Sequence, residues 1–400
     1  MTPSLRYLFV TFLKIGATAW GGFMALIAVV QKQMERDKVI DNETILDGIS
    51  LAAVLPGPTA VNVVSFIGYK LRGIKGTLVC MAGIILPSFL LMLLLASFYD
   101  RFGQSPASVH FFEGVLPAVA ALIASVAFDM FRKSVVEWRQ GVIVVLSTAI
   151  ITASKSYAST VLVLVAAGLA GWLMFRGGGR TNPVIPPPVS RPRKARGGRA
   201  LVIVVAGLAV GVGVLLGLSF MPAGWAEAAR LHRTIMITFS GMSLSLFGGG
   251  YVVIPAMQKV VVDSLHWLSH REFADAIAMG QVTPGPIFIS ATLIGYKVGG
   301  FWGALNATLS IFLPPALLMV GCAHFLERIK TSSLLPALFK GLRPAIIGMI
   351  FSAALTILLN NDFSRGTAAL FLVSLIVAIR YKVNPVVLIP AAGLFGLLVF

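Results

Sequence analysis

Two stretches of the chain decide its fold: VLPGPTAVNVVSFIGYK, from Val54 to Lys70, and VTPGPIFISATLIGYK, from Val282 to Lys297. Each contains Pro-Gly-Pro and, about ten residues later, Gly-Tyr-Lys, and each lies in a run that is apolar enough to cross a membrane. Proline removes a backbone donor and clashes with the carbonyl four residues back, so the motif should break a helix. At membrane depth, broken backbone is tolerated only where it is buried in protein or lines a cavity. The two breaks are therefore predicted to be functional.

Composition indicates an all-α polytopic membrane protein. Of 400 residues, 57% are hydrophobic and only 12% are charged, whereas soluble domains have roughly 25% charged residues. The mean hydropathy is +0.91. The net charge of +17 does not predict a nucleic-acid partner, because the Lys and Arg residues lie in short runs between apolar segments, as in cytoplasmic loops.

The residues that could bind metal or carry out catalysis are scattered. Cys80 and Cys322 lie in apolar segments without neighbours at metal-ligand spacing, so no disulfide framework is predicted. His266 and His270 are four residues apart, but the glutamate of a His-Glu-x-x-His site is missing. No nucleophile or phosphate-loop motif occurs. The sequence predicts no metal, no cofactor and no enzymatic activity.

An internal repeat organises the chain. An offset of 227 residues aligns Gly68-Tyr69-Lys70 with Gly295-Tyr296-Lys297 and Pro87 with Pro314, and the Pro-Gly-Pro motifs align at 228. Matches along nearly one diagonal indicate two copies of one structural unit. We predict a first repeat over residues 1–175, a linker over 176–199, an inverting transmembrane segment over 200–220 and a second repeat over 221–400.

The linker, RGGGRTNPVIPPPVSRPRKARGGR, has seven basic residues, five prolines and no acid. Such a segment cannot bury a core, and it is predicted to be an extended cytoplasmic tether; contact with anionic lipid is the alternative. The basic loops then place the N-terminus in the cytoplasm and the C-terminus outside. The apolar run at the N-terminus is predicted to be a first span that is retained in the mature protein. The segment 200–220 has no partner in the first half, so the second repeat should be inverted.

Spans of about 20 residues divide the chain into about 13 segments, within a range of 10 to 13, and two of these segments are short. The predicted spans lie near 6–30, 44–69, 76–98, 113–131, 140–154, 158–175, 200–220, 234–258, 272–296, 302–325, 343–359, 367–380 and 384–400.

The broken helices suggest a transport site for an anion. Inverted repeats are typical of transporters with a binding site near the midplane, and a helix that restarts after a break offers unpaired N–H groups and a positive dipole end. Glycine clusters also interrupt the spans at 6–30 and 234–258, each preceded by a hydroxyl, Thr18 or Ser245. Packing kinks and close contacts between small residues are the alternative for all these motifs. The candidates are Thr18, Gly21, Gly22, Pro56, Gly57, Pro58, Ser245, Gly248, Gly249, Pro284, Gly285 and Pro286.

These motifs carry a resemblance to a known family. FLKIGATAWGGFMALIAVVQKQ with LAAVLPGPTAVNVVSFIGYKLRGIKG, and FSGMSLSLFGGGYVVIPAMQK with AIAMGQVTPGPIFISATLIGYKVGGFWGA, are similar to the Gly-Gly and Pro-Gly-Pro signatures of the chromate ion transporter family. The resemblance covers roughly residues 5–130 and 234–358. It implies export of chromate, a tetrahedral oxyanion like sulfate, across the bacterial inner membrane by the proton motive force. Phe23 and Gly250 follow the glycine pairs, where long-chain members tend to have proline; single-repeat members are closer in this respect.

Four polar residues complete the predicted site. Lys14, whose repeat counterpart is Gly241, is a cation that suits an oxyanion, with snorkelling as the alternative. Asn62 is expected to reach across the cavity. Asp47 and Asp275 each precede a Pro-Gly-Pro motif by nine residues and could carry a coupling proton; alternatively, they stabilise helix N-termini as first-turn acids. Ser269 and Glu272 read as a capping box.

The repeats and the broken helices therefore predict a secondary active antiporter for an anion, and the resemblance implies chromate or a sulfate-like anion as its substrate. The alternative functions are transport of another small anion and a membrane-embedded role in lipid processing. Membrane lipid and a homodimer are the other predicted partners.

Overall fold

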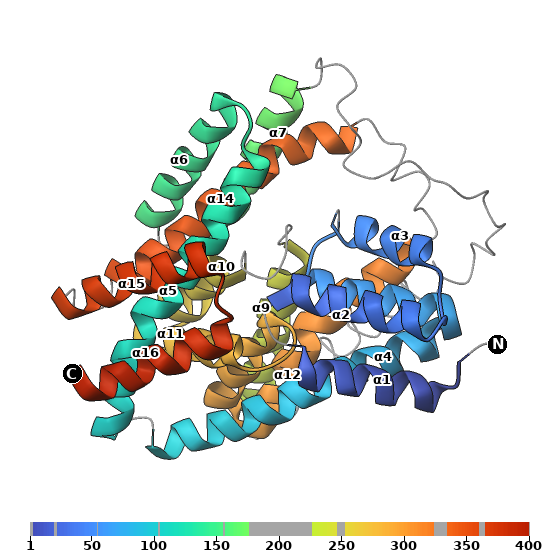
Figure 1. Ribbon diagram of the computed structural model, residues 1–400, viewed down its shortest axis with the longest axis horizontal. Helices are drawn as coiled ribbons and strands as arrows, with labels where there is room; N and C mark the ends of the chain where they lie inside the picture. The colour runs from blue at the N-terminus through green and yellow to red at the C-terminus, as the bar shows by residue number, and fades with distance from the viewer. Residues whose placement is uncertain are drawn as a thin grey trace. The chain divides into compact units, whose positions relative to one another are not determined.

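The computed structural model describes residues 3–19, 22–53, 55–102, 105–154, 157–175, 226–245, 253–323, 334–359 and 365–399. The predicted linker and inverting segment lie outside these residues, as do Gly21, Gly248 and Gly249. All regular structure in the described part is helical, which confirms the all-α prediction (Figure 1).

The helices of the second half follow those of the first in the same order. The first half holds α1 (Leu5–Thr18), α2 (Gly22–Arg36), α3 (Asn42–Ala52), α4 (Thr59–Phe102), α5 (Pro106–Ser134), α6 (Trp138–Ala153) and α7 (Tyr157–Phe175). The second holds α9 (Ala226–Ser245), α10 (Val253–Gln258), the π-helix η3 (Lys259–Ser264), α11 (His270–Val282), the 3₁₀ turn η4 (Ile287–Ile289), α12 (Ser290–Cys322), α14 (Leu334–Leu359), α15 (Arg365–Tyr381) and α16 (Pro385–Val399).

The helices α4 and α12 are each a helical hairpin rather than one rod. Arg72 and Gly73 leave helical geometry with φ of −141° and +63°, and Gly299 and Gly300, 227 residues later, do the same with −141° and +59°. A straight helix would separate residues 65 and 77 by about 18 Å. Yet the Thr77 hydroxyl donates to the Ser65 carbonyl at 3.1 Å. The chain therefore folds back on itself at each kink.

Glycines make both hairpins possible. A Cβ on Gly68 would meet the backbone of Gly76, and a Cβ on Gly295 would meet that of Gly303, so each glycine pair lets the two arms touch. In the second hairpin the hydroxyls of Thr292 and Thr308 also bond across the arms at 2.8 Å. The second arm of α4 covers the span predicted over 76–98, whereas the first arm covers only the end of the span predicted over 44–69, which also contains α3.

Contacts divide the chain into two compact units that differ from its sequence halves. One unit combines residues 1–93, 183–250 and 284–332, and the other combines 94–182, 251–283 and 333–400. Each unit draws on both halves of the chain. The repeats along the sequence are therefore interleaved in space.

In the second unit, each repeat packs on the other. Helix α14 packs against α6 and α7, and α5 packs against α15 and α16, while α5 and α14 also touch. Small residues form the crossings, since Gly114 lies against Gly396 and Gly171 against Gly341 with no room for a Cβ at either contact. This is the close backbone approach that small residues allow between membrane helices.

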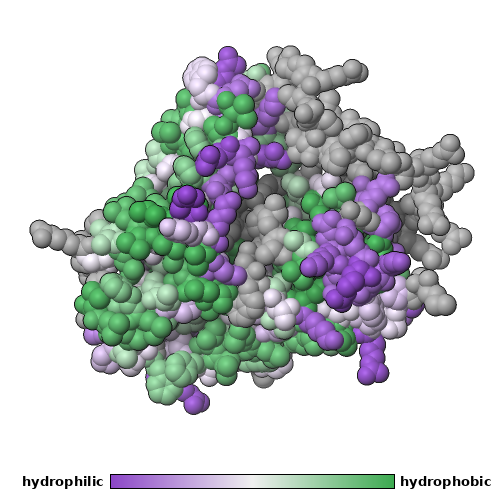
Figure 2. Space-filling model, in the orientation of Figure 1, coloured by the Kyte–Doolittle hydropathy of each residue, from purple (hydrophilic) through white to green (hydrophobic). Residues whose placement is uncertain are grey.

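Four described helical segments are long and apolar enough to cross a membrane: Thr59–Phe102, Pro106–Ser134, Ile287–Cys322 and Ala337–Leu359. Four shorter apolar segments lie at Trp138–Ala153, Ser159–Met174, Gly366–Tyr381 and Pro385–Val399. In Figure 2, hydrophobic residues cover the visible face of α15 and α16, and hydrophilic residues gather over α2 and α3. Exposed side chains such as Leu372, Ile376 and Leu398 suit contact with lipid.

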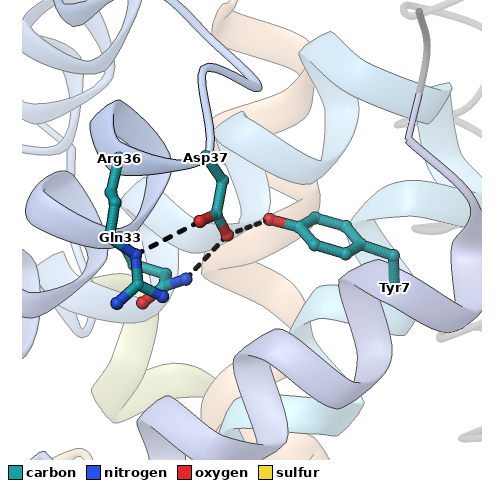
Figure 3. Close-up of polar contacts among 4 residues, drawn as sticks. All are labelled: Tyr7, Gln33, Arg36 and Asp37. Carbon is teal, nitrogen blue, oxygen red and sulfur yellow. Dashed lines mark hydrogen bonds and ion pairs between the residues drawn. The ribbon is translucent and has the colours of Figure 1, made fainter.

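A polar cluster joins the start of α1 to the turn after α2 (Figure 3). The Asp37 carboxylate accepts hydrogen bonds from the Tyr7 hydroxyl, from the Gln33 amide at 2.6 Å and from Arg36 at 3.3 Å. The hydrogen bond from Tyr7, followed by that from Gln33, holds the pKa of Asp37 below its ordinary value.

Candidate anion site at two helix breaks

The first predicted break is present. Helix α3 ends at Ala52 and α4 begins at Thr59, and between them Gly57 has a φ of +96°, which favours glycine. The Asn62 side-chain amide donates to the Pro56 carbonyl at 3.0 Å and so fastens the restarted helix to the break. Residues 55–68 are buried without interruption. The break is thus enclosed in protein, as the sequence argument requires.

The second break has the same backbone form, but different hydrogen bonds hold it in place. Helix α11 ends at Val282, and the chain restarts through η4 into α12. Gly285 has a φ of +107°, and its N–H donates to the Ala19 carbonyl at 3.1 Å. The Ser88 hydroxyl donates to the Pro284 carbonyl at 2.7 Å. Residues 283–295 are buried.

Each break is lodged against helices of the opposite repeat. A Cβ on Gly57 would collide with the Pro315 ring of α12 and approach the Ser243 carbonyl of α9. A Cβ on Gly285 would collide with the Ser88 hydroxyl of α4 and approach the Gly16 carbonyl of α1. Pro315 lies 227 residues after Ser88, and Ser243 lies 227 after Gly16. The contacts are therefore reciprocal, and all of them lie within the first compact unit.

The restarted helices expose backbone donors to the protein interior. Thr59, Ala60 and Val61 form the first turn of α4, have no intrahelical acceptor, and are between 0% and 8% exposed. At the second break, only the N–H groups of Ile287 and Phe288 lack an intrahelical acceptor, because the Ile289 N–H donates to the Pro286 carbonyl at 3.0 Å. Within the described residues, these five N–H groups have no acceptor. The sequence predicted such donors but not that the second start has fewer.

The other predicted contributors lie apart from the breaks or outside the described residues. Lys14 is exposed on α1. The Thr18 hydroxyl donates to the Lys14 carbonyl at 2.7 Å, and the Ser245 hydroxyl donates to that of Gly241 at 2.6 Å. Both hydroxyls are thus engaged in the turn before them. Gly22 begins α2.

The two predicted coupling acids differ in burial. Asp47 is half-buried in α3, whereas Asp275 is 1% exposed in α11. Neither lies in the first turn of its helix, so their proposed role as first-turn acids is wrong. The caps are Asp41 for α3 and Ser269 for α11, and the predicted capping box of Ser269 with Glu272 is confirmed.

Several important partners were not predicted from sequence. The Tyr99 hydroxyl donates to Asp275 Oδ2 at 2.6 Å, across 176 residues of chain. The buried ammonium of Lys259 donates to the Ile151 carbonyl at 2.7 Å and to the Ser154 carbonyl, at the end of α6. No local pattern signals these contacts; the offset of 227 could have paired Ser88 with Pro315. His270 contacts Asp263, 3.7 Å away, and the Gln258 amide.

Comparison with known proteins gives the family. The sequence profile described as Chromate transporter matches residues 6–172 and 233–397, so the same profile fits both halves. The chain belongs to the chromate transporter family. Membership makes it a multi-pass membrane protein of a transporter family, which implies that it is not an enzyme.

Relatives of this family member fall into two lengths. It is 28% identical to an uncharacterized transporter of Methanocaldococcus jannaschii over 99% of this chain and 95% of that one. It is also 28% identical to the chromate transport protein of Cupriavidus metallidurans, over 100% and 94%. An uncharacterized transporter of Bacillus subtilis is 29% identical over 41% of this chain but 95% of its own length. No solved structure matches.

Proposed function

We propose that this chain is a secondary active transporter that exports chromate or a related tetrahedral, sulfate-like oxyanion across the bacterial inner membrane, driven by the proton motive force. One observation carries the proposal: at the two buried helix starts after Gly57 and Gly285, backbone N–H groups have no acceptor among the described residues. A helix N-terminus carries about half a positive charge, so an anion is the ligand that such a start prefers.

The energetics favour an oxyanion at these donors. A buried N–H without an acceptor costs about 1–3 kcal/mol. Three such groups in the first turn of α4 and two at η4 are therefore destabilising unless an acceptor binds them. A tetrahedral oxyanion has acceptor oxygens in several directions, so one ion satisfies several N–H groups at once. The names of the chromate transport relatives favour chromate among such ions.

The reciprocal packing supports movement of the site rather than static binding. Because each break is held by helices of the opposite repeat, a shift of one repeat against the other changes the surroundings of both breaks. Alternating access in repeat-built transporters works in this way.

We further propose that the repeats are inverted, with about 13 spans, a cytoplasmic N-terminus and an outside C-terminus. The support is the unpaired apolar segment 200–220 and the distribution of basic residues. A homodimer is the proposed assembly, and light scattering of the purified protein tests it.

Transport is tested with inverted membrane vesicles and labelled chromate or sulfate. We expect saturable uptake that unlabelled chromate and sulfate inhibit, and none in vesicles without the protein. A panel of competing anions then ranks the substrates. Absence of uptake of every small anion, under every ion gradient applied, would contradict the proposal.

A further inference from the structure

Asp275 has an unusual environment for an acid. Its side chain is 1% exposed on α11. Oδ2 accepts the hydrogen bond from Tyr99 at the end of α4, 2.6 Å away. Oδ1 is buried and has no hydrogen-bond partner among the described residues. Half of the carboxyl group is therefore unsatisfied.

Within the described residues, no Lys, Arg or His forms an ion pair with this carboxyl group. Arg271, one turn earlier on the same helix, donates instead to the Val109 carbonyl at 3.0 Å, and Glu272 is engaged in the capping box. The nearest charges are thus one basic and one acidic group that are both occupied elsewhere.

The neighbouring helices add no compensating charge. Helix α11 packs against α5, α16 and α10. Neither α10 nor α16 contains a titratable side chain. Helix α5 brings His110 and Glu113 near its N-terminal end, and neither forms an ion pair with Asp275. Tyr99 itself packs edge-on against Phe112, with ring centroids 5.6 Å apart, so the surroundings are largely apolar.

The burial decides which form of Asp275 is stable. An ionised carboxylate without a cation costs several kcal/mol in such a place, even after relaxation. A neutral acid leaves one unpaired O–H, at about 1–3 kcal/mol. With a proton on Oδ1, Oδ2 remains the acceptor that Tyr99 requires. The observed hydrogen bond and the unsatisfied oxygen both fit the protonated acid.

We propose that Asp275 and Tyr99 form the proton-binding site that couples anion movement to the proton gradient. This inference rests on the proposed transport function. In this proposal, Asp275 holds a proton while it is buried. The carboxyl group releases the proton to water when the site opens to one side, and it takes up another proton from water when the site opens to the opposite side. Helix α11 ends at Val282, two residues before Pro284, so the acid lies on the helix that leads into the second break.

The repeat does not duplicate this arrangement. The counterpart of Asp275 is Asp47, which is half-buried, and the counterpart of Tyr99 is Leu326. The site therefore combines the acid of the second repeat with the tyrosine of the first, and the equivalent pair, Asp47 and Leu326, lacks the tyrosine hydroxyl.

Infrared spectroscopy of the purified protein tests proton binding independently of transport. We expect the wild type at neutral pH to show a carboxylic acid carbonyl band that is absent in Asp275→Asn and shifted in Tyr99→Phe. Asp100→Asn, the same change at the exposed neighbour of Tyr99, serves as the matched control and should keep the band. A band that survives in Asp275→Asn would overturn the proposal, and Tyr99→Phe provides the test should Asp275→Asn not fold.

Proteoliposomes then test coupling. With equal anion concentrations on both sides, a pH gradient should drive accumulation of labelled chromate or sulfate in the wild type and in Asp100→Asn. Accumulation should fall to the level of empty liposomes in Asp275→Asn. Wild-type accumulation in Asp275→Asn would overturn the coupling role. A wild type that shows the band but moves no anion would overturn the proposed function and coupling, while supporting proton binding at Asp275.

Discussion

At the scale of single residues, Gly57 and Gly285 set the geometry of the candidate site. Both have positive φ, and both face a residue of the opposite repeat at the position a Cβ would take. A methyl group added at these positions would meet Pro315 or Ser88, so replacement of either glycine tests packing.

Gly57→Ala should therefore destabilise the protein by about 2–5 kcal/mol, because backbone strain and overpacking act together. Gly73→Ala is the matched control: its φ is +63°, but nothing lies within 4 Å of the added Cβ. It should lose only about 1–2 kcal/mol, from strain alone. Gly141→Ala lies within α6 with neither constraint, so it should gain about 0.5–1 kcal/mol from the better helix propensity of alanine. Thermal unfolding in detergent gives the comparison; equal stability of Gly57→Ala and wild type would contradict the described packing.

Asp37 should make stability depend on acid. Its folded pKa lies below the unfolded value, mainly through the hydrogen bond from Tyr7, so its contribution is present above the unfolded pKa of about 3.9. That contribution is lost as the pH falls through the folded pKa. Melting temperatures between about pH 5 and pH 3 should fall more steeply for the wild type than for Asp37→Asn. Parallel curves would mean that the cluster in Figure 3 does not stabilise the fold.

Sequence alone predicted the residues that break helices and not the ones that hold the breaks. Pro56 and Gly57 act locally, because proline lacks a backbone donor and glycine adopts a positive φ. The sequence alone therefore predicts their effect. Ser88 and Pro284 meet across 196 residues, and Asp275 meets Tyr99 across 176. Such contacts depend on tertiary packing, which no local pattern encodes.

At the scale of helices, Lys259 fastens the end of α6. Its ammonium donates to the carbonyls of Ile151 and Ser154, where the helix leaves acceptors unsatisfied. The counterpart in the first repeat, Lys32, is exposed. The repeats thus share a lysine at this position but use it differently.

Lys259→Met keeps the length of the side chain and removes its donors. We expect a loss of about 1–3 kcal/mol, because the carbonyls lose a charged partner, and faster amide hydrogen exchange at the end of α6. Lys32→Met is the matched control and should change neither quantity. Unchanged exchange in Lys259→Met would show that other groups satisfy these carbonyls.

The helical hairpins show which structural features a hydropathy pattern predicts and which it does not. The spans near 44–69 and 76–98 were separated by their basic loop, and the kink at Gly73 agrees. The break at Gly57 then divides the first of them into two helices, as Pro-Gly-Pro predicted. The contact of Gly68 with Gly76 was not predicted, because glycine spacing alone does not reveal which backbones approach.

At the scale of the whole molecule, two copies of one unit form a protein of the chromate transporter family. Their interleaving could not be read from the order of segments, since the repeats are consecutive in the chain. It follows from side-chain packing: α5 packs against α15 and α16, and α14 packs against α6 and α7.

The proposed topology is tested by reporters fused within residues 176–199 and after Phe400. We expect a cytoplasmic signal from the first and an external signal from the second, because the basic loops remain inside. A cytoplasmic signal after Phe400 would mean that the proposed count of spans is wrong by one.

The central claim is that backbone N–H groups at the two breaks bind the transported oxyanion. Solid-state NMR of the ¹⁵N-labelled protein in lipid tests it most directly, by following amide signals as sulfate or chromate is added against a chloride background. We expect saturable shifts of the amide signals at Thr59, Ala60 and Val61 and at Ile287 and Phe288. The Ser108 amide should stay constant, because its N–H already donates to Ser105. Constant signals at both breaks, in a protein that still takes up the anion, would contradict the account.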